Sequence, residues 1–135
     1  MGQVTAFDSS IFVYLLESHR RYYSTVRKLF LEVESGENQG IFANIGLIEL
    51  LTGPKQLGRY DIAYEYKNYI QNFPNLIITE LNEPIVNFAS DLRGRYRIKT
   101  PDAVHLASAI VYGADVFITN DKALKKVREV AVKVL

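Results

Sequence analysis

The 135-residue chain has no cysteine and no tryptophan, and only 4 of its residues are proline. Without cysteine it can form neither disulfides nor thiolate zinc sites. An excess of charge of one sign is also missing, because 16 Lys and Arg face 15 Asp and Glu. This balance argues against a strongly basic arm that coats nucleic acid or anionic lipid. The apolar fraction of 48% excludes a disordered chain and favours a folded core.

Long apolar runs are absent as well. Gly, Asp or His interrupts each apolar stretch well before the roughly 18 residues that a membrane helix needs. No Lys or Arg precedes His19, so the start of the chain lacks the positive charge of a signal peptide. We therefore expect a cytoplasmic protein without a membrane partner.

The apolar residues recur alternately with strand and helix spacing. The predicted strands are residues 4–7, 40–43, 75–79, 116–119 and 131–135, and the predicted helices are 11–17, 20–34, 45–52, 60–73, 84–93, 100–112 and 122–129. No repeat or linker-like tract divides the chain, so residues 1–135 are expected to form a single domain. Strands separated by helices predict a three-layer α/β/α fold around a parallel sheet of about four to five strands.

Three carboxylates stand alone in segments that are otherwise built for a core. Asp8 is the only charged residue in positions 1–16, Glu49 in 38–54 and Asp102 in 100–114. An isolated carboxylate in an apolar environment costs several kcal/mol unless a cation or hydrogen-bond donors meet it. Each acid can be a structural cap, and the free N–H groups of a helix start would suit Asp102 in that role.

Glu49 does not fit a capping role, because it lies inside a predicted helix. The i, i+3, i+4 rule puts it on the same stripe as Ile45, Ile48 and Thr52, so we expect it to point where the apolar face points. That helix contains no basic residue before position 55 that could neutralise it. The charge partner of Glu49 must therefore come from another element.

Two acids follow predicted strands. Asp8 comes directly after residues 4–7, and Asp121 follows residues 116–119 after Asn120. The carboxyl ends of parallel strands form the functional crevice of such sheets, so these acids are expected to converge there. Asp102 begins a helix and can lie on the same rim, whereas Asp115 lies at the amino end of its strand and is expected to be structural.

Four carboxylates in one crevice repel one another unless divalent cations bind between them. Oxygen ligands without cysteine or a paired-histidine motif favour hard ions, Mg²⁺ or Mn²⁺, over zinc. An acid-lined site for such ions suits the hydrolysis of phosphodiester bonds.

At this point the sequence resembles PIN-domain ribonucleases, in particular VapC-type toxins of toxin–antitoxin pairs. The resemblance covers essentially the whole chain and is carried by FDSSIFVYLLE at 7–17, IELLTGP at 48–54 and IKTPDAVHLASAIVYGADVFITND at 98–121. It implies a PIN-like α/β fold and a catalytic, metal-binding quartet of Asp8, Glu49, Asp102 and Asp121. It also assigns auxiliary polar positions to Ser10, Thr119 and Asn120. Ile45 and Gly46 depart from the family pattern, where more hydroxyl side chains are expected.

The resemblance further implies a Mg²⁺- or Mn²⁺-dependent endoribonuclease with an RNA substrate. Its expected partners are a second copy of the chain and a VapB-like antitoxin whose C-terminal segment crosses the acidic crevice. The alternatives are a PIN-like module that binds RNA or protein without cutting it, and an aspartate-phosphorylated receiver or phosphatase. The last class needs a second acid next to the first strand, and the stretch Asp8-Ser9-Ser10 has none.

A basic run precedes Asp102 and is a candidate for contacts with RNA phosphates. It consists of Arg93, Arg95, Arg97 and Lys99. Cations at a helix end are also favoured by the helix dipole alone, so an ordinary solvated surface explains the run equally well. His105, one turn after Asp102, is a weaker candidate for a base or a ligand, since a buried histidine is more often satisfied by a structural hydrogen bond.

Overall fold

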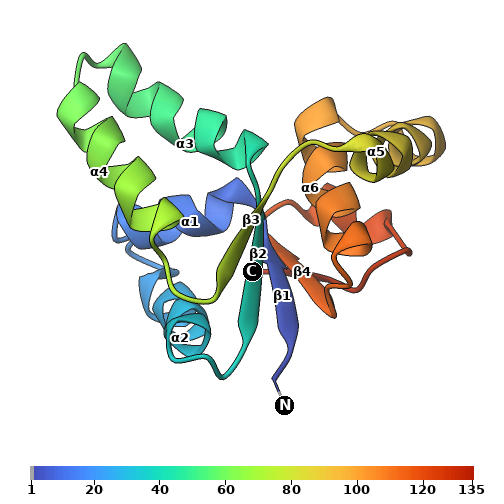
Figure 1. Ribbon diagram of the computed structural model, residues 1–135, viewed down its shortest axis with the longest axis horizontal. Helices are drawn as coiled ribbons and strands as arrows, with labels where there is room; N and C mark the ends of the chain where they lie inside the picture. The colour runs from blue at the N-terminus through green and yellow to red at the C-terminus, as the bar shows by residue number, and fades with distance from the viewer. Residues whose placement is uncertain (1) are drawn as a thin grey trace.

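A computed structural model of the protein describes residues 2–135, and Figure 1 shows a central sheet between two groups of helices. The strands are β1 (Val4–Phe7), β2 (Gln39–Ala43), β3 (Leu76–Thr79), β4 (Val116–Thr119) and β5 (Val132–Val134). The helices are α1 (Ser9–Leu16), α2 (Tyr23–Glu34), α3 (Ile45–Gln56), α4 (Tyr60–Gln71), α5 (Glu83–Tyr96) and α6 (Thr100–Val111), followed by the 3-10 helix η1 (Lys122–Lys126). None of the helices within 2–135 is long and apolar enough to cross a membrane.

All paired strands run parallel, in the order β3-β2-β1-β4-β5. The predicted three-layer α/β fold is confirmed, with five strands in the sheet. From β1 the chain first builds β2 and β3 on one side and then crosses to β4 and β5 on the other. The order therefore reverses between β1 and β4, and the crevice beyond such a switch point is where open α/β sheets bind ligands.

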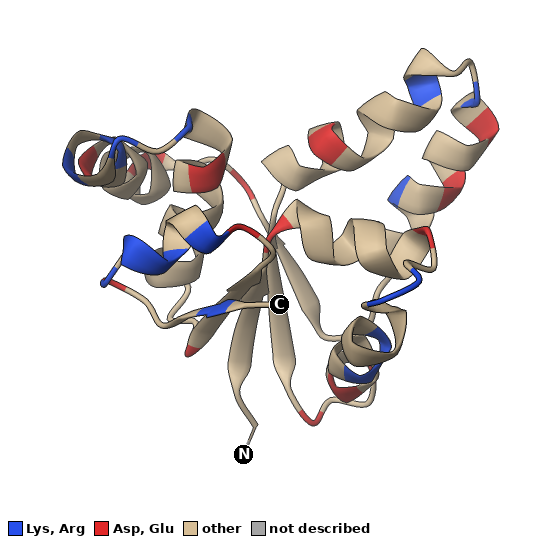
Figure 2. Ribbon diagram, turned by 180° about the vertical axis from the view of Figure 1, so that it is seen from behind, with Lys and Arg blue, Asp and Glu red and all other residues tan. Residues whose placement is uncertain are grey.

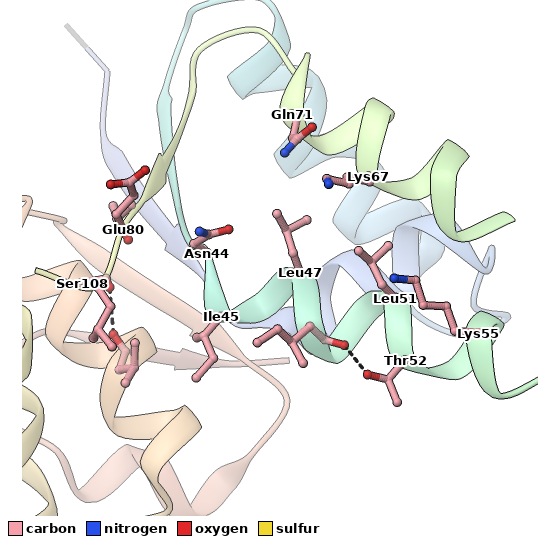
Figure 3. A pocket seen from close by; sticks show the side chains of 14 residues that line it. Asn44, Ile45, Leu47, Leu51, Thr52, Lys55, Lys67, Gln71, Glu80 and Ser108 are labelled. Carbon is pink, nitrogen blue, oxygen red and sulfur yellow. Dashed lines mark hydrogen bonds between the residues drawn. The ribbon is translucent and has the colours of Figure 1, made fainter. Parts of the chain in front are cut away.

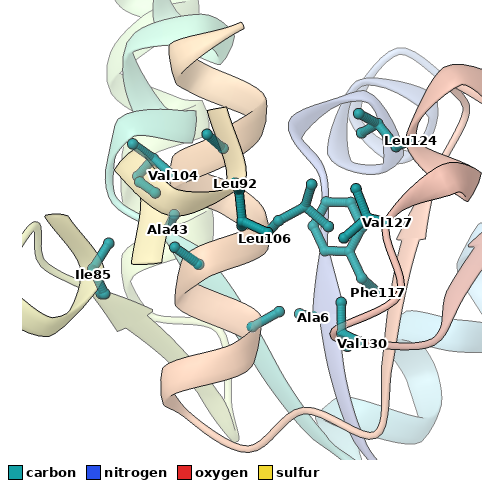
Figure 4. Close-up of a cluster of buried hydrophobic side chains, with 14 of the residues drawn as sticks. Ala6, Ala43, Ile85, Leu92, Val104, Leu106, Phe117, Leu124, Val127 and Val130 are labelled. Atoms are coloured by element: carbon teal, nitrogen blue, oxygen red, sulfur yellow. The ribbon is translucent and has the colours of Figure 1, made fainter. Parts of the chain in front are cut away.

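Successive residues of each strand face opposite sides of the sheet. Ala6 and Phe117 belong to the cluster under α5 and α6, which Figure 4 shows in close-up. Phe7 and Ile118 belong to the cluster under α1 and α2 on the other side. Figure 1 shows the same division, with α1 to α4 on one side of the sheet and α5 and α6 on the other. Strands buried on both faces explain why their sequences read as continuous apolar runs.

Gly46 lies in the first turn of α3, directly on the ring of Phe42. A Cβ built at Gly46 would come within 2.2 Å of the ring Cζ of Phe42. The ring of Phe42 in turn packs 4.6 Å from that of Phe12. A hydroxyl side chain at position 46 would collide with this aromatic layer, which explains the departure from the family pattern.

Several helix boundaries differ from the predictions. The helix expected to end at position 52 continues through Gly53 and Pro54, and the one expected to end at 93 continues through Gly94 to Tyr96. Gly53 directly precedes Pro54, and a residue without a Cβ tolerates the helical conformation before proline. A Cβ at Gly94 would meet nothing outside its own helix within 4 Å, so Gly94 lies in an open helical position, where glycine costs only about 1 kcal/mol. The helix expected over 122–129 is a 3-10 helix that ends at position 126.

Asp115 lies at the opposite edge of the sheet from the predicted site. Its Oδ2 accepts a hydrogen bond of 2.8 Å from the backbone N–H of Val4. The backbone N–H of Asp115 donates to the carbonyl of Val4 at 2.7 Å. This reciprocal pair ties the starts of β1 and β4 together, and the predicted structural role of Asp115 is confirmed.

Candidate active site

Asp8 and Thr119 meet where β1 and β4 end. Register pairs Phe7 with Ile118, so the next residues of the two strands lie side by side. The N–H of Asp8 donates to the carbonyl of Ile118 at 2.9 Å, and the hydroxyl of Thr119 donates to Oδ2 of Asp8 at 2.6 Å. Asp8 is only 7% exposed and Thr119 is fully buried. The sheet therefore holds one carboxylate firmly at its switch point.

Asp121 joins this arrangement through the same hydroxyl. Its backbone N–H donates to Oγ1 of Thr119 at 3.1 Å, while its own Oδ1 accepts from the N–H of Ala123 at 2.9 Å and caps η1. The auxiliary residue Asn120 behaves differently, because its side-chain amide donates to the hydroxyl of Tyr14 at 2.9 Å. Thr119 thus belongs to the acidic site, whereas Asn120 supports the loop from the α1 side.

Asp102 lies in the first turn of α6 and is half-buried. Burial raises its pKa above the usual 3.8, and the nearby carboxylates of Asp8 and Asp121 raise it further. Within the described residues, no hydrogen-bond donor offsets this charge. No side-chain cap hydrogen bond forms at the start of α6. The raised pKa agrees with this, because a capping aspartate would have a lowered pKa.

Glu49 does not lie on the buried stripe that was predicted for it. The buried residues of α3 are Gly46, Leu47 and Leu50, whereas Ile48 is 67% exposed. The stripe prediction was wrong because α3 rests on the close contact at Gly46, which turns the neighbouring positions outward. Glu49 instead projects from the side of α3 toward α6.

The partner of Glu49 is His105 on α6. Nε2 of His105 lies 2.7 Å from Oε1 of Glu49, and the histidine side chain is only 1% exposed. Burial acts to raise the pKa of Glu49, but the hydrogen bond with His105 acts against it, and the pKa lies below the ordinary 4.5. Glu49 is thus stabilised as a carboxylate at the rim of the acidic site.

Within residues 2–135, none of the four predicted acids forms an ion pair with a Lys or Arg. The ion pairs of Lys and Arg within 2–135 join Arg59 to Asp61 and Arg95 to Glu129, and the contact between His105 and Glu49 is a hydrogen bond. No Lys or Arg nitrogen described here therefore lies within 4.0 Å of the predicted quartet. Figure 2 shows acidic segments meeting near the centre of the view and basic segments on the surrounding elements.

The donor chemistry fits a hard divalent cation, although the side chains do not form a preassembled cage. In residues 2–135, no group of three or more His, Cys, Asp or Glu side chains is close enough to hold a metal ion. The acids have protein partners instead: Asp8 binds Thr119, Glu49 binds His105 and Asp121 caps η1. The buried hydroxyl of Ser10, the remaining auxiliary residue, has no partner in the part of the chain that is described.

Two of the four cations in the basic run, Arg93 and Arg95, have hydrogen-bond or ion-pair partners within the protein. Nε of Arg93 donates to the carbonyl of Ile98 at 3.0 Å, and Arg95 is paired with Glu129. Arg97 and Lys99 are exposed and make no ion pair with any described residue. They connect α5 to α6 and lie just before the turn that carries Asp102.

Sequence reasoning missed the residues that support the acids. Ser9 donates to Oδ1 of Asp8 at 3.4 Å and also lowers the pKa of Glu49, and Tyr14 orders the loop through Asn120. For His105 a structural hydrogen bond was expected more than a role as base or ligand, but its partner, Glu49, was not predicted. The i, i+3 spacing of Asp102 and His105 was a usable signal, because it puts both side chains on one face of α6.

Comparison with known proteins places this arrangement in a family. The family model for the PIN domain matches residues 6–130, and the chain belongs to this family. No curated protein matches the chain.

Solved structures with the same fold include several VapC-containing complexes. VapBC2 from Rickettsia felis, bound to a DNA fragment from its promoter, has a TM-score of 0.76 at 18% identity and covers 97% of this chain and 98% of its own. DNA-bound VapBC from Salmonella typhimurium has a TM-score of 0.77 at 15% identity, with 99% and 98% covered. VapC20 from Mycobacterium tuberculosis, a toxin that cleaves the sarcin-ricin loop, has a TM-score of 0.71 at 15% identity, with 94% and 98% covered. At these identities the likeness concerns the fold.

Proposed function

We propose that this protein is a Mg²⁺- or Mn²⁺-dependent endoribonuclease, the toxin of a toxin–antitoxin pair, that acts in the cytoplasm as a single PIN-like domain over residues 1–135. The observation that carries the proposal is the mutual effect of Asp8, Asp102 and Asp121 near the switch point, where no described Lys or Arg forms an ion pair with them. Membership of the PIN family and the toxin-containing structural neighbours support it.

Asp8 and Asp102 are the proposed principal metal ligands, with Glu49 and Asp121 completing the site. A bound divalent cation would neutralise phosphate oxygens and lower the pKa of an attacking water. Thr119 holds one oxygen of Asp8 by its 2.6 Å hydrogen bond, so the other oxygen keeps a fixed direction. The unpartnered hydroxyl of Ser10 is available to orient a ligand or water.

Cleavage of a structured RNA in the presence of Mg²⁺ or Mn²⁺ tests the proposal. Chelator, Asp8→Asn and Asp102→Asn should each abolish cleavage. Asp115→Asn is the matched control, because it removes the same charge at the opposite edge of the sheet and should leave cleavage intact. Equal activity of the wild type and the two site variants would rule out this mechanism.

The proposed antitoxin has a groove to bind, lined by residues next to Glu49 and His105 in the chain and not by the four predicted acids themselves. This groove, of about 640 Å³, lies between α3, α4, α6 and the segment after β3, and Figure 3 shows Leu47 and Leu51 on its wall and Lys55 and Lys67 on its rim. The charged lining residues are Lys55, Lys67 and Glu80, so the apolar walls fit an apolar segment that carries an acidic side chain toward the two lysines. Co-expression with a neighbouring small open reading frame, followed by purification of a complex and loss of nuclease activity, tests this partner.

The proposed second partner is another copy of the chain. Tyr60 and Tyr64 of α4 are 64% and 67% exposed, and exposed tyrosines are enriched at protein interfaces. Light scattering should give the mass of a dimer, and Tyr64→Lys should shift it toward the monomer. A monomeric wild type would contradict the proposal.

A module that binds RNA without cutting it is the second candidate. It is favoured by the absence, in residues 2–135, of a preassembled group of three metal-binding side chains. Titration with Mn²⁺ separates the two functions. An acidic site that binds no Mn²⁺, in a protein that still binds RNA, would favour the binding module over the nuclease.

A further inference from the structure

His105 is one of only two histidines in the chain. It lies on α6, and its side chain is buried where α6 faces Glu49 of α3. Its ring lies 5.8 Å from that of Phe42, and its side chain is only 1% exposed. Because the side chain has only two torsions and is surrounded by other residues, the ring has a fixed orientation. Its Nε2 points at Oε1 of Glu49 across a distance of 2.7 Å.

The other ring nitrogen identifies the tautomer. Nδ1 of His105 is buried and has no hydrogen-bond partner among the described residues. A hydrogen on Nδ1 would be a buried N–H without an acceptor, which is costlier than an unused lone pair. The hydrogen therefore sits on Nε2, where Glu49 accepts it.

Glu49 needs such a donor more than the other acids do. Asp8 and Asp121 have short side chains, held by the hydroxyl of Thr119 and by the N–H of Ala123. Glu49 is a longer side chain that projects from α3 and is 36% exposed. A free glutamate in that position would sample several rotamers. The bond from His105 restricts its carboxylate to the side of α3 that faces α6.

We propose that His105 is a positioning residue, whose buried Nε2–H holds the Glu49 carboxylate in place for a divalent cation at the acidic site. This inference rests on the proposed function. Removing a residue that hydrogen-bonds to a metal ligand and so orients it typically changes the metal affinity by about 10- to 100-fold.

Three variants test the inference by calorimetric titration with Mn²⁺. His105→Leu removes the donor and keeps an apolar side chain in the buried position, and it should raise the Kd for Mn²⁺ about tenfold. His105→Gln retains an N–H at a similar reach and should restore most of the affinity. His19→Leu, at the exposed second histidine, is the matched control and should bind Mn²⁺ as the wild type does.

A double-mutant cycle distinguishes positioning from general destabilisation. Adding His105→Leu to Glu49→Gln should weaken Mn²⁺ binding no further, because the histidine acts through that carboxylate. Additive losses, or wild-type affinity in His105→Leu, would overturn the inference and leave the proposed nuclease intact. A wild type that binds no Mn²⁺ would overturn both. Should His105→Leu fail to fold, His105→Asn, whose shorter amide cannot reach Glu49, takes its place.

Discussion

Thr119 and Asp8 are 111 positions apart in the chain, yet the hydroxyl of Thr119 donates a 2.6 Å hydrogen bond to the buried carboxylate of Asp8. The bond closes the gap between two parallel strands at the point where the strand order reverses. The same hydroxyl accepts from the N–H of Asp121 at 3.1 Å. One buried oxygen thus connects two of the predicted metal ligands.

Thr119→Val should therefore destabilise the protein. The substitution keeps the size and branching of the side chain but leaves a buried carboxylate oxygen without its donor, at a cost of about 1–3 kcal/mol. The free energy of unfolding from urea titration measures the loss. Thr119→Ser, which retains the hydroxyl, should lose distinctly less. If valine and serine were equally stable, the hydrogen bond would contribute nothing to stability.

The positions of Asp8 and Asp121 could be predicted from the sequence because each follows a short apolar run, and parallel strands end at the same edge. The contact between Glu49 and His105 could not be predicted from the sequence. It joins residues 56 positions apart and depends on the angle at which α3 leaves β2. That angle depends on Gly46, whose missing side chain lets the helix rest on Phe42. The spacing of apolar residues describes each helix separately, so it does not indicate how α3 is oriented relative to α6.

Gly46→Ala should be destabilising, although alanine favours helices. Its Cβ would lie 2.2 Å from the Phe42 ring, and relieving such overpacking typically costs about 1–3 kcal/mol. Gly94→Ala, in the interior of α5, is the control, since a Cβ there meets no neighbouring side chain or loop within 4 Å and no proline follows it. It should be stabilising by about 0.5–1 kcal/mol. Thermal unfolding of the two variants compares them, and equal shifts would contradict the close contact.

The raised pKa of Asp102 predicts a stability that falls as the pH increases. Below about pH 3.8 this carboxyl is protonated in both the folded and the unfolded chain. As the pH rises, the unfolded chain loses its proton first, so the free energy of unfolding decreases until the pKa of the folded state is passed. Asp102→Asn removes this penalty. Metal-free Asp102→Asn should therefore unfold at the same or a higher temperature than the wild type at pH 7.

Two measurements complete the test of Asp102. The difference between Asp102→Asn and the wild type should vanish below about pH 3.8, and the variant should gain less stability than the wild type on adding Mn²⁺. Asp115→Ala is the contrasting variant, because it removes the acceptor of the Val4 N–H and should lower the unfolding temperature. A clear loss of stability in metal-free Asp102→Asn at pH 7 would instead favour the role of a helix cap.

Arg97 and Lys99 are the two cations of the basic run that the protein does not use internally, so they should contact RNA phosphates. Replacing both with Gln should raise KM for RNA and leave kcat nearly unchanged. It should also reduce the slope of log affinity against log salt by about 1.4, at roughly 0.7 per phosphate contact on a single strand. Lys125→Gln with Lys126→Gln removes the same charge from exposed residues of η1 and serves as the control. Equal salt slopes for both double variants would mean that only net charge matters and that Arg97 and Lys99 form no specific contact.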